Sequence, residues 1–227
     1  MPITTCIFDA YGTLLDVSAA ARAAAAEPGR ERLADCWPEI AKNWRSKQLG
    51  YTWLRTIMDD HADFWTVTGD ALDWALAAEG IDDPDLRARL MELYRELEAF
   101  PEVAPMLRRL KAAGLNTAIL SNGTPDMLEA ATVSAGIRGD LDDILSVEMV
   151  GIYKPSRAVY DMVGRRFACA PGEVLFVSSN GWDAAAASAY GFTVAWANRA
   201  SEPVEALPGK PHHVLSDLET IPALAGA

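Results

Sequence analysis

Ile3-Thr4-Thr5-Cys6-Ile7-Phe8-Asp9-Ala10-Tyr11-Gly12-Thr13 is the stretch of the sequence that decides the fold. Its first six residues are apolar or β-favouring and predict a buried strand, and the turn-prone residues from Tyr11 onward predict a loop directly after it. Asp9 stands where the strand passes into the loop. Strand patterns of the same kind recur at 116–120, 144–146, 174–178, 193–197 and 213–215.

Helical patterns separate these predicted strands, at 102–113, 125–135, 157–167 and 182–190. Alternation of strand and helix predicts a parallel sheet that is covered by helices on both faces. Residues 16–97 contain no convincing strand, and their apolar residues recur with helical period; the last such pattern, 85–98, opens at Pro84. We therefore predict an α/β core from 1–15 and 98–227, with an all-helical insert at 16–97.

The composition limits the functions that are possible. The chain has 227 residues, half of them hydrophobic, and a formal net charge of −12 without a block of Lys or Arg, so we expect no nucleic-acid partner. Three cysteines without paired spacing predict no disulfide framework and favour the cytoplasm. We see neither a signal peptide nor a stretch that would span a membrane, and no zinc motif.

Polar clusters follow four of the predicted strands, at 9–13, 121–124, 154–155 and 178–183. In open α/β sheets the ligand site lies beyond the carboxyl ends of the strands, so these clusters are expected to converge. Asp9 alone is as consistent with a turn cap as with a nucleophile, since Asp bonds its own backbone well. Together with Thr13 and the other clusters, the nucleophile is favoured, because a carboxylate can attack carbon or phosphorus.

The motifs occur in a specific order, which is Phe8-Asp9-Ala10-Tyr11-Gly12-Thr13-Leu14, Leu120-Ser121-Asn122-Gly123, Tyr153-Lys154-Pro155 and Phe176-Val177-Ser178-Ser179-Asn180. This ordered set resembles the haloacid dehalogenase superfamily over nearly the whole chain. The resemblance implies a Rossmann-like parallel sheet core with an inserted helical cap.

Two departures indicate the branch of that superfamily. Its phosphatases usually carry a second Asp two residues after the nucleophile, to protonate an alkoxide; Tyr11 stands there, and a halide leaving group needs no proton. They also place an acid just after the fourth motif to hold Mg²⁺, whereas no acid occurs here before Asp183. Both departures resemble the L-2-haloacid dehalogenases, which implies that neither a metal nor another cofactor is needed.

The resemblance also implies the site residues. The catalytic set is Asp9, Thr13, Arg45, Lys154, Ser178, Asn180 and Asp183. The substrate-binding set is Ala10, Tyr11, Arg45, Leu49, Phe64, Ser121, Asn122, Tyr160 and Trp182. Among these, Arg45, Asn122 and Phe64 are expected around the departing halide, and Ser121 with nearby amides around the substrate carboxylate. Ser178 and Asn180 are expected to fix the Asp9 carboxylate, and Asp183 to position the hydrolytic water.

Several of these residues have a plainer interpretation. Arg45 would be a solvated helix residue without the resemblance, and Tyr160 and Trp182 would be core. Lys154 precedes Pro155, which can open a helix; an ion pair with Asp9 is favoured over a solvated lysine. Thr124 can cap a helix that starts at Pro125. The segment from Asn180 to Asp183 resembles a capping box.

The expected activity is that of an (S)-2-haloacid dehalogenase, a hydrolase that converts L-2-haloalkanoic acids to D-2-hydroxyalkanoic acids through an ester on Asp9. Its partners are then a small 2-haloacid and the halide product, and a homodimer is expected through the aromatic-rich helix at 37–58. The alternatives are a Mg²⁺-dependent phosphatase of the same superfamily and a catalytically idle binding protein on this fold. All of Asp9, Thr13, Ser121, Lys154 and Asp183 are present, which favours the enzyme.

Overall fold

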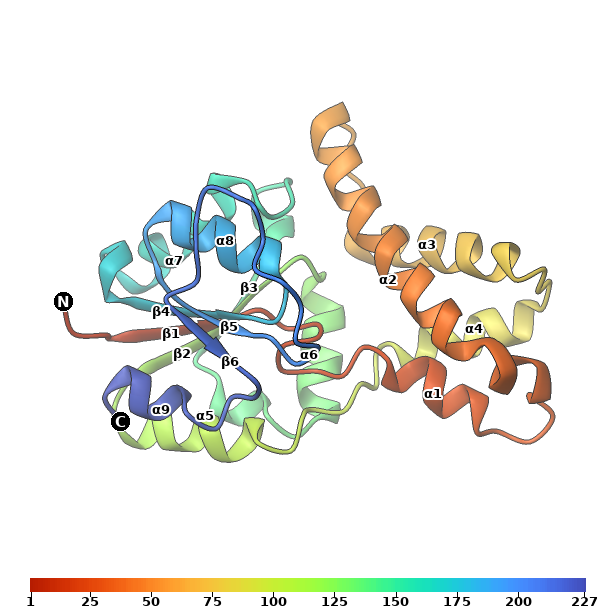
Figure 1. Cartoon of the computed structure of the whole chain (residues 1–227), viewed down its shortest axis with the longest axis horizontal. Helices are drawn as coiled ribbons and strands as arrows, with labels where there is room; N and C mark the ends of the chain where they lie inside the picture. The colour runs from red at the N-terminus through yellow and green to blue at the C-terminus, as the bar shows by residue number, and fades with distance from the viewer.

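β1 (Thr5–Phe8) lies in the middle of a six-stranded parallel sheet in the computed structural model, which describes all 227 residues (Figure 1). The order of the strands is β3-β2-β1-β4-β5-β6. The other strands are β2 (Asn116–Ser121), β3 (Asp143–Ser146), β4 (Val174–Ser178), β5 (Thr193–Ala197) and β6 (His213–Leu215). All predicted strands are confirmed. β1 is completely buried, because β2 and β4 pair with its two edges and helices cover both faces.

Five helices accompany the sheet: α5 (Val103–Ala112), α6 (Pro125–Ser134), α7 (Arg157–Phe167), α8 (Gly181–Tyr190) and α9 (Ile221–Ala225). In Figure 1, α7 and α8 lie above the sheet, and α5 and α9 lie below it. This arrangement confirms the predicted α/β class. The sequence did not predict α9, because five residues are too few to display a helical period.

Residues 19–93 form four helices: α1 (Ala19–Ala25), α2 (Glu31–Met58), α3 (Phe64–Ala78) and α4 (Pro84–Leu93). Pro84 opens α4 as predicted, and the Asp83 side chain caps it by accepting from the Leu86 N–H at 2.9 Å. The predicted end of this helix at Glu98 is wrong. The helix ends at Leu93, because the chain must turn there to return to the sheet.

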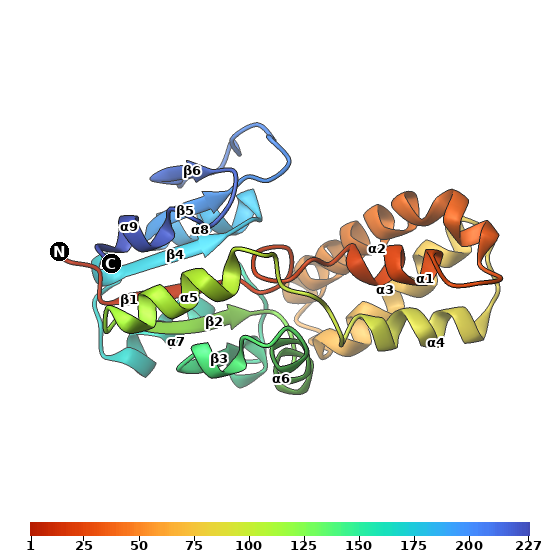
Figure 2. The ribbon, with the colours of Figure 1, turned by 90° about the horizontal axis from the view of Figure 1, so that it is seen from below.

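Two backbone segments join this helical part to the sheet. The Phe100 N–H donates to the Leu14 carbonyl, and the Asp16 N–H donates to the Glu98 carbonyl. Figure 2 shows that the strands point with their carboxyl ends toward the helical part. The chain leaves β1 toward β2 and β3 on one side, and β4 to β6 lie on the other side. The crevice expected at such a switch of strand order therefore lies at the end of β1, facing the helices.

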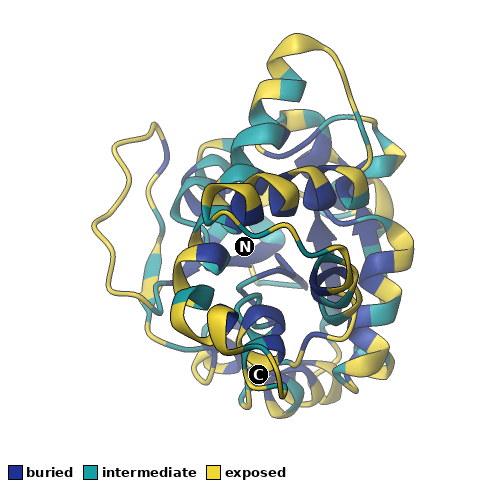
Figure 3. Cartoon of the chain, turned by 90° about the vertical axis from the view of Figure 1, so that its right-hand side faces the viewer, coloured by how far each residue is buried: buried dark blue, intermediate teal, exposed yellow.

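The strands form the interior of the sheet part, while the helices keep outward faces exposed, as the colouring of Figure 3 shows. One connected cluster of buried apolar residues includes Phe8 and Phe176 of the sheet and Phe64 and Leu72 of the helical part. No helix combines the length and the apolar character that crossing a bilayer requires. The two parts therefore share a continuous apolar interior around the end of β1.

Candidate active site

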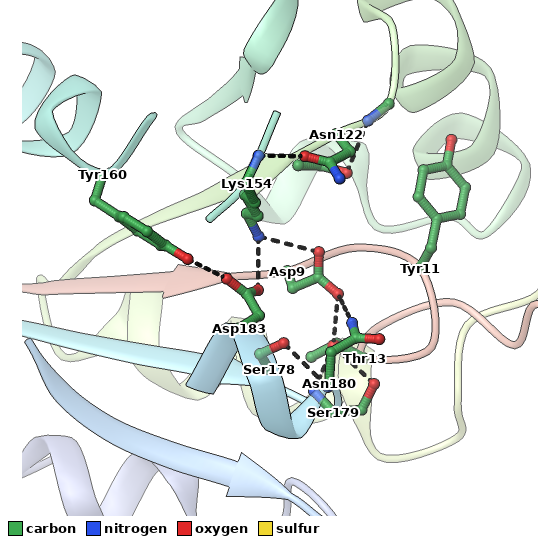
Figure 4. A network of polar contacts seen from close by, with 12 residues as sticks. Asp9, Tyr11, Thr13, Asn122, Lys154, Tyr160, Ser178, Ser179, Asn180 and Asp183 are labelled. Atoms are coloured by element: carbon green, nitrogen blue, oxygen red, sulfur yellow. Dashed lines mark hydrogen bonds and ion pairs between the residues drawn. The ribbon is translucent and has the colours of Figure 1, made fainter. Parts of the chain in front are cut away.

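The carboxylate of Asp9, at the carboxyl end of β1, is 6% exposed and accepts hydrogen bonds from three side chains (Figure 4). Lys154 Nζ donates to Oδ1 at 3.2 Å. Thr13 Oγ1 and Asn180 Nδ2 donate to Oδ2 at 3.0 and 2.9 Å. Because an oxygen of a carboxylate offers about two lone pairs, Oδ2 is fully used and Oδ1 retains one. Asp9 is therefore a fixed carboxylate with one oxygen free to react.

The hydroxyl of Thr13 is itself oriented by the end of β4. Its oxygen accepts the backbone N–H of Ser179 at 2.8 Å, and its single hydrogen is then available for Asp9. The loop between Asp9 and Thr13 closes on the carbonyl of Ala10, which accepts the N–H groups of Thr13 and Leu14. The sharp loop that the sequence predicts after β1 thus places a hydroxyl donor against the carboxylate.

Asn180 connects Asp9 to the helical part. Its Oδ1 accepts from Arg45 Nη2 at 3.1 Å while its Nδ2 donates to Asp9. Arginine has only donors and a carboxylate only acceptors, so this orientation of the amide is the one that the neighbours require. Asn180 precedes α8 but makes no side-chain capping bond, which leaves its amide for the site. The capping-box alternative is wrong for Asn180 and Asp183.

Lys154 stands between two buried carboxylates. Its Nζ lies 2.9 Å from Asp183 Oδ2 as well as 3.2 Å from Asp9 Oδ1, and Tyr160 donates its hydroxyl to Asp183 Oδ1 at 2.7 Å (Figure 4). The ion pair between Lys154 and Asp9 is thus the one predicted. Pro155 does not open a helix, because α7 begins at Arg157, as the helical pattern predicted, and the lysine therefore does not precede the first turn directly.

Burial and charge act against each other in this cluster. Burial would lower the pKa of Lys154, but the charges of Asp183 and Asp9 and their hydrogen bonds outweigh it and raise the pKa above its ordinary value. Burial raises the pKa of Asp183 against the opposing charge of Lys154, and the charge of Asp9 raises it further. Burial and Asp183 also hold the pKa of Tyr160 well above its usual range. Two carboxylates therefore share one ammonium, and Tyr160 remains a donor.

β2 ends beside this cluster with two buried polar residues. Asn122 Oδ1 accepts the backbone N–H of Lys154 at 3.1 Å, so both hydrogens of its Nδ2 remain available. Ser121 Oγ accepts the Gly123 N–H at 3.2 Å, which leaves the hydroxyl hydrogen to donate. Thr124 caps α6 by accepting from the Met127 N–H, and this prediction is confirmed.

Aromatic side chains of Tyr11, Phe64 and Tyr94 form an apolar wall where the site meets the helical part. The ring of Tyr11 lies 5.8 Å from that of Phe64 and 5.4 Å from that of Tyr94, with which it stacks. Tyr11 is buried and its hydroxyl has no partner. A Cβ on Gly123 would lie 2.8 Å from the Tyr11 ring, so only glycine allows this close approach. Tyr11 therefore acts as a wall and not as an acid at the nucleophile.

Some predicted residues lie farther from Asp9 in the network. Ser178 Oγ accepts the Asn180 N–H at 3.2 Å, so it acts on Asp9 only through Asn180. Leu49 follows Arg45 by one turn of α2 and is half-buried. Trp182 is half-buried and packs edge-on against Trp53, at 5.3 Å between ring centroids. Neither of the last two has a polar contact with Asp9.

Gln48 is a further polar residue beside the site that was not predicted from the sequence. It is 1% exposed, and its Oε1 accepts from Arg45 Nη1 at 2.9 Å. Residues three apart on a helix are neighbours, and this spacing was the available signal. No group of three or more His, Cys, Asp or Glu side chains is arranged to hold a metal ion. Between Asp9 and Asp183 the place of a cation is taken by the Lys154 ammonium.

Comparison with known proteins agrees with this geometry. The sequence model of a hydrolase family described as haloacid dehalogenase-like hydrolase matches residues 3–191. An (S)-2-haloacid dehalogenase 1 from Pseudomonas sp. strain CBS-3 is 44% identical over 98% of this chain and 96% of its own. An (S)-2-haloacid dehalogenase 4A from Burkholderia cepacia is 43% identical over 89% of this chain and 86% of its own.

A solved structure covers the chain at least to the same extent as these relatives. The L-2-haloacid dehalogenase from Xanthobacter autotrophicus with chloropropionic acid covalently bound superposes with a TM-score of 0.89 at 36% identity, over 99% of both chains. The match extends through both the sheet and the helical part. This chain therefore belongs to the haloacid dehalogenase-like hydrolases and, within them, to the (S)-2-haloacid dehalogenases.

Proposed function

We propose that this enzyme hydrolyses L-2-haloalkanoic acids to D-2-hydroxyalkanoic acids through an ester on Asp9. The observation that carries the proposal is the buried Asp9 carboxylate, which three donors orient and which keeps one oxygen free. The related enzyme from Xanthobacter autotrophicus holds chloropropionic acid covalently bound, as a carboxylate nucleophile would require.

In the first step, Asp9 Oδ1 attacks C2 from behind the carbon–halogen bond. A C–O bond forms, the halide leaves with the bonding electrons, and the centre inverts. Asn122 Nδ2 and the unused N–H groups of Arg45 would receive the halide, since both are donors and the halide only accepts. Phe64 supplies the apolar side of this pocket. No proton is needed, so Tyr11 in place of an acid has no cost.

In the second step, water attacks Cγ of Asp9 and the ester C–O bond breaks. We infer that Asp183 accepts the proton of this water, because it is buried beside Asp9 and its raised pKa makes it a stronger base than an ordinary aspartate. Thr13 and Asn180 donate to Oδ2, which is the carbonyl oxygen of the ester and takes up the charge of the attack, while Lys154 lies at Oδ1, the ester oxygen that leaves with the product. Asp183 then passes this proton to the departing alkoxide, which gives the hydroxy acid. The second proton of the water remains on the Asp9 carboxyl and is released to solvent, which restores the Asp9 carboxylate.

The substrate carboxylate needs donors on the side of β2. The hydroxyl hydrogen of Ser121 is free and the N-terminus of the ten-residue α6 follows closely. Free backbone N–H groups and the dipole at a helix start favour an anion. We therefore assign Ser121 and the neighbouring amides to the carboxylate, which fixes the hand of the substrate relative to Asp9.

We further infer that residues 16–97 act as a cap domain, since Arg45 and Phe64 reach the site from α2 and α3. A homodimer would cover the exposed apolar side chains of the last turn of α2, where Leu54, Ile57 and Met58 are 55%, 81% and 69% exposed. The molar mass of the wild type and of Ile57→Glu in light scattering would test the dimer. We infer a cytoplasmic location from the three unpaired cysteines.

The decisive experiment is halide release from separate L- and D-2-chloropropionate, with and without EDTA. We expect release from the L form only, with D-lactate as product and no effect of EDTA. Asp9→Asn, assayed fresh before it deamidates, should be inactive. Turnover in ¹⁸O-water should place the label in the Asp9 carboxylate during the first cycle; label in the lactate alone would rule out the ester. Mg²⁺-dependent cleavage of phosphate esters would instead support the phosphatase.

A further inference from the structure

Gln48 forms the centre of a buried polar network inside the helical part. It lies on α2 beneath Arg45, with its side chain shielded from solvent. Its Nε2 donates to Thr68 Oγ1 at 2.7 Å and to the Tyr94 hydroxyl at 3.0 Å. Its Oε1 accepts from Arg45 Nη1. A buried amide with every group satisfied is rigid, because any other orientation leaves polar atoms without partners.

The direction of each hydrogen bond in this network follows from the chemistry of its ends. Arg45 can only donate, so Gln48 must present Oε1 to it and Nε2 to the opposite side. Thr68 donates its hydroxyl to the Phe64 carbonyl at 2.6 Å, and its oxygen is therefore available to accept from Gln48. The chain of donors runs from Arg45 through Gln48 and Thr68 to the backbone of Phe64. Arg45 and Phe64, the two residues of the helical part that are proposed to contact the halide, are therefore both linked to the Gln48 amide.

Arg45 is held at three of its five N–H groups. Nη1 donates to Gln48, and Nη2 donates to the Tyr11 carbonyl at 3.2 Å and to Asn180. The two Nη2 bonds attach one end of the guanidinium to the sheet part, and the Nη1 bond anchors its other end to α2. The Nε hydrogen and the second Nη1 hydrogen remain free for a ligand. Without Gln48, the guanidinium would keep only the Nη2 anchor, and the Nη1 and Nε groups that face the ligand could shift relative to the site.

We propose that Gln48 is a positioning residue, which aligns the free N–H groups of Arg45 with the departing halide and so determines how weak a leaving group the enzyme accepts. This rests on the proposed function, in which Arg45 receives the halide. Stabilisation of a developing anion depends on donors that are aligned beforehand, because no energy is then spent on turning them during the reaction. A poor leaving group such as chloride needs that stabilisation more than bromide does.

The test uses Gln48→Met, which keeps the length of the side chain but has no acceptor, and Gln48→Glu, which keeps the acceptor but cancels the charge of Arg45. We expect kcat/KM for L-2-chloropropionate to fall about 100-fold in Gln48→Met, the effect of a misplaced group in a site. The loss for L-2-bromopropionate should be smaller. Bromide should inhibit both variants about tenfold less strongly, the equivalent of one lost hydrogen bond to a charged group.

Thr52→Val is the matched control. Thr52 lies one turn further along α2, is completely buried, and bonds only the Leu49 carbonyl. It should lower the Tm without changing the chloride-to-bromide ratio or bromide inhibition. If the Gln48 variants behave in the same way, Gln48 is only structural and the inference is wrong. If Gln48→Met does not fold, unchanged bromide inhibition in Gln48→Glu would overturn it equally.

A wild type that releases no halide from L-2-chloropropionate or L-2-bromopropionate would contradict the proposed function, and this result is distinct from a failure of the inference about Gln48. The rise of the wild-type Tm with increasing bromide measures halide binding without turnover. A rise that is lost in the Gln48 variants but retained in Thr52→Val would support the inference even then. A rise of equal size in all four proteins would overturn it.

Discussion

Replacing Lys154 with Met is expected to destabilise the protein by about 3–5 kcal/mol and to abolish turnover. Lys154 Nζ lies 3.2 Å from Asp9 and 2.9 Å from Asp183, and its side chain is 1% exposed. At an effective dielectric constant of about 20, each pair attracts by about 5 kcal/mol. The cost of burying the ammonium offsets part of this attraction. Met matches the length of the side chain, so the remaining loss is electrostatic.

Differential scanning calorimetry measures this loss, and about 3–5 kcal/mol corresponds to a Tm lower by about 6–20 °C in a chain of this size. The loss of stability in Lys154→Met depends on pH. The pKa of Asp183 is already raised by burial, and the variant removes the charge of Lys154 that opposes this rise. The folded variant then binds a proton more tightly than the unfolded chain does, so its stability is gained as pH falls through the raised pKa and lost as pH rises through it.

The matched control is Lys111→Met, because Lys111 is 44% exposed and lies 3.8 Å from Asp142. Such a surface pair contributes about 1 kcal/mol or less. The Tm difference between Lys154→Met and the wild type should narrow from a pH near neutrality to a second, lower pH nearer the ordinary range of a carboxyl group, while that of the control stays small at both. A Tm for Lys154→Met within about 2 °C of the wild type at both pH values would refute the view that this lysine neutralises the two buried carboxylates.

Three further predictions concern single side chains. Thr13→Val should lower kcat about tenfold or more, because it removes a 3.0 Å donor to Asp9, while Thr13→Ser should retain most activity; equal losses in steady-state assays would contradict a role for the hydroxyl. Burial raises the pKa of Cys6 to about 12, so a thiol reagent at about pH 8 should modify Cys6 only after unfolding, as peptide mass spectrometry would detect. Tyr160→Phe removes the 2.7 Å hydrogen bond to Asp183 and should slow ester hydrolysis about tenfold, so that the ester accumulates in the intact mass after a single turnover; halide release without accumulation would place Tyr160 outside that step.

Much of the architecture was readable from local patterns. The run from Thr5 to Phe8 is apolar on both faces, which only a strand buried on both sides tolerates, and the turn residues after Asp9 mark its end. The helices at 125–134 and 157–167 were predicted almost to the residue, because Thr124 caps one and helical periodicity marks the other. The end of α4 at Leu93 was not predicted, since the residues that follow it bond to the distant segment after β1, where the Asp16 N–H donates to the Glu98 carbonyl.

The sequence also predicted which clusters form the site. Each cluster follows a strand, and the carboxyl ends of parallel strands meet at one edge of the sheet. What the sequence lacked was the connection between them. The ammonium of Lys154 is shared by Asp9 and Asp183, although only the pair with Asp9 was expected. Ser178 was expected to fix Asp9, but its Oγ accepts the Asn180 N–H, and it is the Asn180 side chain that reaches the carboxylate.

Only the tertiary structure decided the roles of Gln48 and the orientation of the Asn180 amide. Gln48 lies 20 residues from Thr68 and 46 from Tyr94, so its hydrogen-bond partners come from distant elements, although its spacing from Trp44 places it on the buried face of α2. An amide has a donor end and an acceptor end, and its orientation is fixed by neighbours from other elements. Sequence periodicity determines which residues leave solvent, whereas hydrogen-bond direction depends on the groups that folding places opposite them.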